Sequence, residues 1–133
     1  MSETFHGWAA KEQGGKLTEF DFDPGEMRPE QVQVKIESCG VCHSDLSMID
    51  NNWGMSEYPL VAGHEVIGIV EKIGDQSKGI SVGDRVGLGW FAGSCLSCQP
   101  CLSGRQQLCS GAEGMIIGRH GGFADKVRAN WEW

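Results

Sequence analysis

The chain has 133 residues, of which 40% are hydrophobic and 22% are charged, a composition typical of one folded domain rather than a disordered segment. Its formal net charge of −7 offers no basic surface for a phosphate backbone, so we expect no nucleic-acid partner. The opening residues, MSETFHGWAAKEQGG, lack a signal-peptide pattern, and no apolar run approaches the roughly 20 residues of a membrane span. We therefore expect no membrane partner and a cytoplasmic protein whose thiols stay reduced.

Short apolar runs separated by glycines predict a mainly β fold. In chain order, strands are expected at 5–10, 17–22, 31–37, 64–74, 84–90 and 123–133. The third run is the clearest, because Val32, Val34 and Ile36 alternate with polar residues at the period of a half-buried strand. About six strands with Gly-rich turns and little helix favour a small, partly open β-barrel.

One short helix is expected directly after the third strand, over residues 43–52. Leu46 and Ile49 have helical spacing there, and the segment from Asn51 to Gly54 supplies a stop signal.

Four cysteines share one short loop with the spacing CxxCxxCx7C: Cys95, Cys98, Cys101 and Cys109. Each CxxC turn lets two thiolates converge on one ion, and Gly104 gives the loop freedom to fold the last cysteine back. Disulfides are the alternative, but cysteines so closely spaced seldom reach relaxed disulfide geometry. Four thiolates leave no open position for a substrate, so we predict a structural zinc lobe over about 93–111.

A second CxxC, formed by Cys39 and Cys42, is ambiguous when taken alone. It could be a redox pair, half of another zinc site, or two core thiols. His64 and Glu65 follow about twenty residues later at the start of an apolar strand, where a lone histidine is most often a buried structural residue. Cysteine, histidine and carboxylates in two such segments instead indicate an incomplete catalytic zinc site, in which three protein ligands leave room for a substrate.

On these motifs the chain resembles the amino-terminal, GroES-like part of the zinc-dependent medium-chain alcohol dehydrogenases. GVCHSD, GHE and the four-cysteine loop occur in the family's order. The stretches CGVCHSDLSMIDNNWG, YPLVAGHEVIG, VGDRVG and GGFADK are similar to the cinnamyl alcohol dehydrogenase type and to bacterial NADPH-dependent aldehyde reductases. The resemblance covers essentially all of residues 1–133 and implies one GroES-like domain that interconverts primary alcohols and aldehydes with NADP or NAD.

The resemblance also implies roles for single residues. Cys42 and His64 would bind the catalytic zinc, and the four-cysteine loop would bind the structural zinc. Asp45 would orient the histidine, and Glu65 would lie behind the metal, unless it is merely a strand residue. Ser44 would pass on the alcohol proton, unless it only caps the helix.

Other positions match the surroundings of such a site. His43 would meet the cofactor pyrophosphate. Trp53, Trp90 and Phe91 would line a pocket for hydrophobic alcohols and aldehydes, with core packing as the alternative. Cys39 is then left over as a core thiol.

The chain also departs from the family's pattern. Ser47 stands where many members have the histidine that ends the proton relay, so the relay would finish through water, ribose or another route. The family's third zinc ligand and its Rossmann domain lie beyond this chain, which has no GxGxxG loop. The ending RANWEW is typical of a chain cut in or just after a strand, with Trp131 and Trp133 on one face of that strand. We therefore expect a fragment that is inactive alone, and whose partners are an alcohol or aldehyde, its own Rossmann domain and a second copy in a homodimer.

Other function classes make different predictions. A non-catalytic, zinc-stabilised binding module would hold one zinc and gives no reason for GVCHSD and GHE to occur together. A thiol redox protein using Cys39 and Cys42 would need a depressed thiol pKa and no dependence on His64. A GroES-like co-chaperone has less support, because a barrel alone carries no function.

Overall fold

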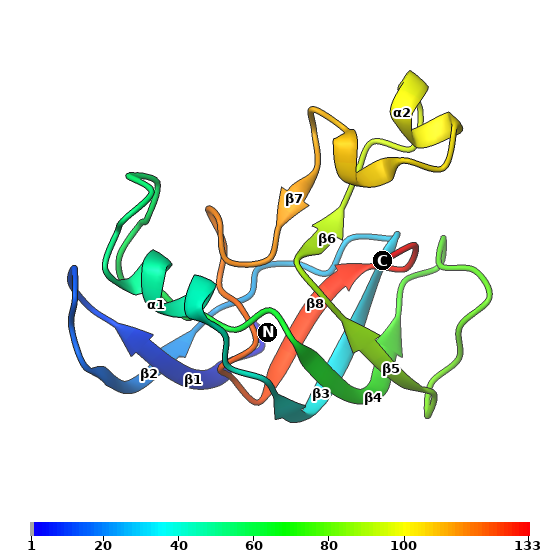
Figure 1. The fold of residues 1–133 in the computed structure, drawn as a ribbon. Coiled ribbons are helices and arrows are strands. Elements are labelled where there is room, and N and C mark those ends of the chain that lie inside the picture. Colours follow the sequence, from blue (N-terminus) through cyan, green and yellow to red (C-terminus); the bar gives the residue numbers. More distant parts are fainter. Residues whose placement is uncertain (1) are drawn as a thin grey trace.

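The computed structural model describes residues 2–133, and within them eight strands are joined by two short helices and one 3-10 turn (Figure 1). The elements are β1 (Phe5–Ala10), β2 (Leu17–Phe22), β3 (Gln31–Cys39), α1 (His43–Ile49), β4 (Val66–Ile73), β5 (Arg85–Leu88), β6 (Phe91–Gly93), α2 (Gln99–Leu102), η1 (Gln106–Leu108), β7 (Glu113–Gly114) and β8 (Lys126–Asn130). The predicted mainly β fold with short helices is confirmed. The short strands β6 and β7 were not predicted.

The body of the molecule is an antiparallel sheet in the order β5-β4-β3-β8, beside a β1-β2 hairpin and a β6-β7 pair. Strand β3 is central, and its Val34 pairs with Val70 of β4 on one side and Val127 of β8 on the other. These valines are nearly inaccessible and belong to one apolar core, which also includes Met48 of α1 and Met115. The core therefore joins the sheet to the helix and to the segment that follows β7.

The first half of β3 is buried on both faces, so the predicted exposure of its polar residues is wrong. Gln33 is 0% exposed and Gln31 is 9% exposed. The amide of Gln33 donates to Glu3 and Glu71, and its oxygen accepts from Arg128 at 2.7 Å. The alternation of the strand was read correctly, but charged side chains from other elements cover its polar face.

Helix α1 is confirmed after the third strand, and of the two apolar residues that indicated it, Ile49 packs against the core and Leu46 does not. Leu46 is 48% exposed, whereas Asp45, Ser47 and Met48 are buried. The helix has only seven residues, and the hydrogen bonds of its first turn fix its orientation, as described below.

The C-terminal segment is not one continuous strand. Strand β8 ends at Asn130, and Trp131 and Trp133 pack partly buried against the core. The Trp133 ring contacts Phe91 with centroids 5.2 Å apart, and its indole donates to Ser94 at 3.3 Å. The sequence therefore ends just after a strand, in agreement with the expectation, but the two tryptophans follow the strand instead of lying on one face of it.

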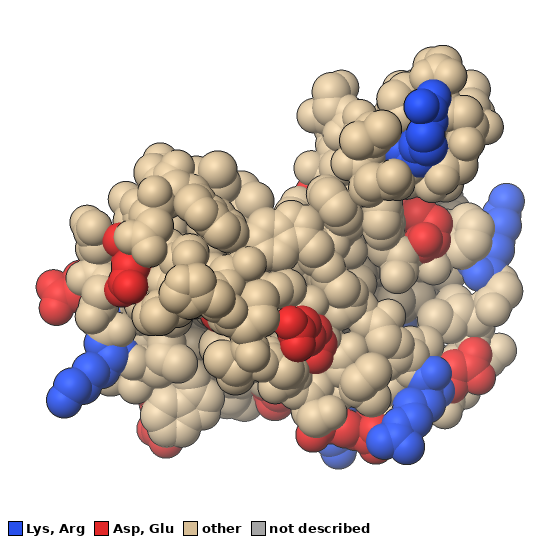
Figure 2. Space-filling view, in the orientation of Figure 1, with Lys and Arg blue, Asp and Glu red and all other residues tan. Residues whose placement is uncertain are grey.

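A lobe carrying α2 and η1 projects from the body and is connected to it through β6 and β7 (Figure 1). On the face drawn in Figure 2, acidic and basic side chains are interspersed rather than gathered into one patch. None of the helices within residues 2–133 is long and apolar enough to cross a membrane.

Glu3 provides a stability test, because its carboxylate connects the N-terminal segment to three strands. It accepts from Lys126 of β8 and Lys72 of β4 at 2.7 Å each, and from Gln33 of β3 at 3.0 Å. The hydrogen bond from Lys126, followed by those from Lys72 and Gln33, lowers the pKa of Glu3 to about 2 from an ordinary 4.5. This stabilisation is complete above the ordinary pKa and is lost as the pH falls toward the lowered one.

We expect Glu3→Gln to reduce the free energy of unfolding by about 1–2 kcal/mol at neutral pH, a value that allows for solvent screening of this partly exposed group. The deficit should shrink as the pH falls from 4.5 toward 2 in urea unfolding experiments. Glu57→Gln, at an exposed carboxylate, is the control and should leave stability nearly unchanged. A deficit that does not vary with pH would contradict this account of Glu3.

Candidate metal sites

The first turn of α1 holds Cys42 in place. Cys42 is the N-cap of the helix, and its sulfur accepts from the backbone N–H of Ser44 at 3.3 Å. In return, the Cys42 backbone N–H donates to Asp45 Oδ2 at 3.0 Å, which completes a capping box. Ser44, for which capping was the alternative role, is not the cap.

The second oxygen of Asp45 reaches the segment that carries His64. Asp45 Oδ1 accepts from the Gly63 backbone N–H at 2.8 Å and lies 3.1 Å from His64 Nδ1. Asp45 is 1% exposed and His64 is 7% exposed, so both groups are buried. A carboxylate at Nδ1 favours the proton on that nitrogen and leaves Nε2 with a free lone pair.

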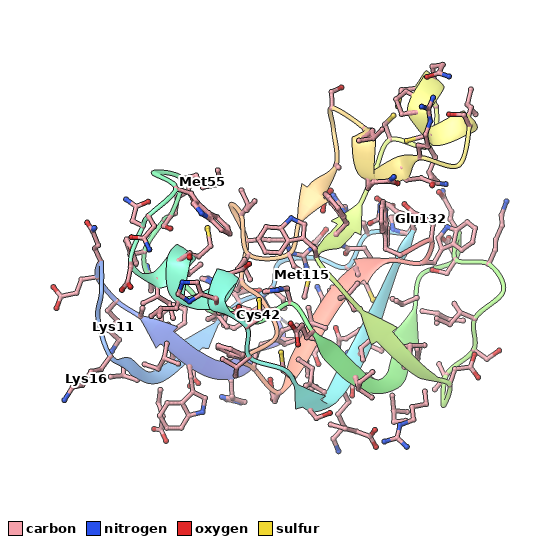
Figure 3. All side chains as sticks on the ribbon, viewed as in Figure 1. Lys11, Lys16, Cys42, Met55, Met115 and Glu132 are labelled. Atoms are coloured by element: carbon pink, nitrogen blue, oxygen red, sulfur yellow. The ribbon has the colours of Figure 1, made fainter. Side chains whose placement is uncertain are left out.

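His64 Nε2 and Cys42 Sγ lie 3.3 Å apart, and a carboxylate oxygen of Glu65 joins them within 4.8 Å. Figure 3 shows Cys42 at the end of α1 that faces the sheet. A zinc ion bound at about 2.3 Å to sulfur and 2.0 Å to nitrogen would separate these two atoms by roughly 3.5 Å in a tetrahedral site. The three donors therefore fit zinc in type, and the cysteine and histidine fit it in spacing.

Gly40 makes room for Glu65. The Gly40 backbone N–H donates to the Glu65 carbonyl at 2.9 Å, and a Cβ at Gly40 would lie 2.1 Å from Glu65 Oε2. The glycine within CGVC therefore lets the carboxylate lie across the turn between Cys39 and Cys42. This role of Gly40 was not predicted from the sequence.

The segment 61–63, just before His64, is held by residues 121–123. Backbone N–H groups of the second segment donate to carbonyls of the first at 2.7 to 2.8 Å. A Cβ at Gly121 would lie 2.4 Å from the Gly63 carbonyl oxygen. The two segments can therefore approach this closely only because residue 121 is glycine. The GGFADK stretch begins with Gly121, so the sequence marks one side of this contact. It does not reveal that residues 61–63 form the other side.

Of the three aromatic residues predicted to line a pocket, Trp53 and Trp90 lie near His64 and Phe91 does not. The Trp90 and His64 rings meet edge to face with centroids 4.8 Å apart, and Trp53 meets Trp90 in the same manner at 6.1 Å. Phe91 packs against Trp133 instead. Next to Cys42, His43 is exposed and Ser44 is half-buried.

The second group lies in the projecting lobe, where all six pairs of sulfurs among Cys95, Cys98, Cys101 and Cys109 lie within 4.8 Å. Cys95 Sγ and Cys101 Sγ are 3.9 Å apart. Four sulfurs at about 2.3 Å from a tetrahedral zinc ion would be roughly 3.8 Å from one another. Gly104 has φ +76, the conformation expected of the glycine that folds the last cysteine back. This four-cysteine cluster is consistent with a structural zinc lobe.

The acid–base properties of the lobe also fit a cation. Backbone N–H donation from Ser97 lowers the pKa of Cys95 to about 5. At Cys98 the Cys101 backbone N–H favours the thiolate, but lost solvation and the neighbouring thiols outweigh it and raise the pKa of Cys98 to about 12. Lost solvation and the neighbouring thiols therefore oppose the Cys98 thiolate, which a bound cation would stabilise.

Cys39 lies half-buried against the core, outside both groups. Burial raises the pKa of the Cys39 thiol. Reactive redox thiols have depressed pKa values, so this environment does not favour a redox pair at Cys39 and Cys42.

Comparison with known proteins agrees with this architecture. Residues 28–133 match the family described as alcohol dehydrogenase GroES-like domain. The chain belongs to this family. It is 53% identical over 122 residues to aldehyde reductase AdhA of Synechocystis, an alignment that covers 92% of this chain and 36% of that protein. It is 42% identical over 128 residues to cinnamyl alcohol dehydrogenase 7 of Arabidopsis thaliana, with 91% and 36% covered.

Solved structures give the same result for this GroES-like domain. Cinnamyl alcohol dehydrogenase SbCAD4 from Sorghum bicolor superimposes with a TM-score of 0.90 at 34% identity, covering 96% of this chain and 39% of that one. CAD from Helicobacter pylori, complexed with NADP(H), gives 0.91 at 27% identity, covering 100% and 41%. The chain therefore spans a little over a third of the length of the relatives it matches.

The contact between residues 61–63 and 121–123 can be tested with one methyl group. We expect Gly121→Ala to reduce the free energy of unfolding by about 1–3 kcal/mol, because its Cβ meets a backbone oxygen that cannot move away cheaply. Gly89→Ala is the matched control, since a Cβ at Gly89 meets nothing within 4 Å. Urea unfolding of both variants measures the difference. Equal stability of the two variants would show that the segments are not held as closely as described.

Proposed function

We propose that this chain is the zinc-binding catalytic domain of an NAD(P)-dependent alcohol dehydrogenase or aldehyde reductase that interconverts primary alcohols and aldehydes. The convergence of Cys42, His64 and Glu65 beside a buried orienting carboxylate carries the proposal. This arrangement has three donors, of which Glu65 is exposed, whereas the lobe has four sulfurs.

In this proposal Cys42 and His64 are ligands of the catalytic zinc, and Glu65 is a third donor within the chain. When bound, zinc polarises a carbonyl oxygen or lowers the pKa of an alcohol. Asp45 keeps the His64 proton on Nδ1, so that Nε2 remains available as a ligand.

Proton transfer and cofactor contact are assigned to the first turn of α1. Ser44 is half-buried beside Cys42, where a hydroxyl could receive the proton of an alcohol and pass it toward solvent. His43 is exposed at the helix start, in a place where it could meet a cofactor pyrophosphate from a neighbouring domain.

Trp53 and Trp90 form an aromatic wall next to His64, which suits hydrophobic alcohols and aldehydes. The relatives named as an aldehyde reductase and as cinnamyl alcohol dehydrogenases support this substrate class. Phe91 is a weaker candidate for this wall, because its ring packs against Trp133.

The four-cysteine lobe is assigned a structural zinc. Leu96, Leu102 and Leu108 are 41%, 75% and 60% exposed, so the lobe buries few apolar side chains of its own. Zinc binding by small cysteine-containing peptides contributes on the order of 10 kcal/mol, which is enough to order such a loop.

The remaining parts of the enzyme are proposed to lie outside this chain. They are a Rossmann domain that binds NADP or NAD, a third protein ligand for the catalytic zinc, and contacts between two copies in a homodimer. The longer relatives, and the complex of the Helicobacter pylori protein with NADP(H), support this division. A cytoplasmic location remains a prediction.

Zinc counting tests the assignment of the two sites. By native mass spectrometry we expect two zinc ions per chain, of which a mild chelator removes one readily, because one site has four thiolates and the other has fewer donors. Cys42→Ser should hold one zinc ion. Cys39→Ser is the matched control from the same CxxC pair and should still hold two.

The alternatives give other counts. One tightly held zinc ion that Cys42→Ser leaves unchanged would favour the non-catalytic binding module. A reversible Cys39–Cys42 disulfide, lost equally in both variants and indifferent to replacement of His64, would favour the thiol redox protein.

We also expect the chain alone, loaded with zinc, to show no NADPH-dependent reduction of a simple aldehyde. The reason is that its sequence has no GxGxxG loop to bind the nicotinamide cofactor. Absorbance of NADPH, followed with and without aldehyde, measures this. Zinc-dependent turnover that Cys42→Ser abolishes would mean that the chain is catalytically complete.

A further inference from the structure

Trp90 connects the candidate catalytic site to the projecting lobe. It lies at residues 89–90, the link between β5 of the main sheet and β6 of the lobe. Its ring meets the His64 ring edge to face, with centroids 4.8 Å apart. Leu88, just before this link, pairs with Val66, which follows His64 by two residues. The side chain that lies against the histidine therefore belongs to the base of the lobe.

Strands β6 and β7 form the stem of the lobe, and this stem is short (Figure 1). Two residue pairs join the strands, with a register irregularity between them: Phe91 with Gly114 and Gly93 with Glu113. At the end near the core, the Met115 backbone N–H donates to the Trp90 carbonyl at 2.7 Å, and Met115 is 0% exposed. An isolated pair of short strands is marginally stable at best in water, so the stem needs a constraint at its other end.

The first and last cysteines of the lobe lie at that other end. Cys95 follows the last residue of β6 by two positions, and Cys109 precedes the first residue of β7 by four. Their sulfurs lie within 4.8 Å of each other. Cys98 and Cys101 are further from both strands in sequence. A metal ion bound to Cys95 and Cys109 would therefore connect the two strands where their pairing ends, and closing a loop in this way stabilises the ordered state.

The body of the molecule holds β6 more firmly than β7. The Trp133 ring packs against Phe91, and its indole donates to Ser94 at 3.3 Å, one residue after β6. On β7, Glu113 lies 3.1 Å from Arg28, but these side chains are 38% and 44% exposed. Ion pairs at such exposure contribute little to stability. Closure of the lobe at Cys109 is therefore the constraint that the outer end of β7 needs.

We propose that the four-cysteine lobe positions the aromatic wall of the candidate catalytic site: when its sulfurs close on a metal ion, the stem is fixed and holds Trp90 against His64. When the lobe opens, β7 separates from β6 and the Trp90 ring moves away from His64. Trp53, whose ring lies 6.1 Å from that of Trp90, then loses its partner as well. The placement of Trp90 follows from the geometry, and its effect on a substrate rests on the proposed function.

Zinc titration of a Cys42→Ser chain tests the proposal, because this variant keeps the four sulfurs of the lobe and lacks a donor of the other group. NMR under reducing conditions measures the nuclear Overhauser effect between the Trp90 and His64 rings. We expect it to be present with one equivalent of zinc and lost without zinc. The indole signal of Trp8, which is 51% exposed on β1, is the control and should not change. Failure of the proposed function would not alter this result, because the variant already lacks the Cys42 thiolate.

Two further variants, made in the same Cys42→Ser chain, separate closure of the stem from zinc binding as such. Cys98→Ala removes a sulfur from within the loop, and Cys109→Ala removes the sulfur next to β7. Each leaves three sulfurs, and native mass spectrometry in excess zinc should count one zinc ion in both. We expect Cys109→Ala to lose the Overhauser effect between Trp90 and His64, and Cys98→Ala to keep it.

An Overhauser effect that persists in the folded, zinc-free chain would overturn the proposal. Equal effects in the two zinc-loaded alanine variants would also overturn it, because the lobe would then act through metal binding and not through the stem. If the zinc-free chain unfolds, the Trp8 signal will change too, and the comparison of the two zinc-loaded variants decides the question.

Discussion

The buried carboxylate of Asp45 is the interaction on which the candidate catalytic site depends. A group that is 1% exposed must find hydrogen-bond donors inside the protein, because an unsatisfied buried carboxylate is very costly. Its donors come from two segments far apart in sequence, the Cys42 backbone on one side and the Gly63 backbone and His64 ring on the other. Satisfying this one carboxylate therefore fixes the cysteine, the helix start and the histidine together.

The sheet brings these segments within reach of each other. Strands β3 and β4 are antiparallel, and Cys39 at the end of β3 pairs with Val66 at the start of β4. Cys42 follows the first strand by three residues, and His64 precedes the second by two, so both extend from the same end of the strand pair. Residues 121–123 close that end from the other side. The sheet thus supplies the approximate position, and Asp45 supplies the precise orientation.

Much of this could be predicted, because strands, turns and cysteine spacing are local signals. The mainly β fold, the helix after Cys42 and the sulfur cluster each follow from patterns within a few residues. Gln33 was misjudged because a period of two distinguishes the faces of a strand but does not reveal what covers them. Charged groups from Glu3, Glu71 and Arg128 cover it, and those contacts span up to 95 residues of sequence. The partner of Gly121 is hidden for the same reason.

The two metal groups differ in how far they rely on the fold. The lobe brings its four sulfurs together within fifteen residues, so a cation can complete this group locally. The Cys42 and His64 group is assembled by tertiary contacts, and its geometry exists only while the sheet and Asp45 hold it. Loss of metal from the lobe should therefore disorder the lobe first, whereas loss of the fold removes the second site even with metal in excess. A site built in this second way can leave a coordination position open, because the protein rather than the metal maintains its shape.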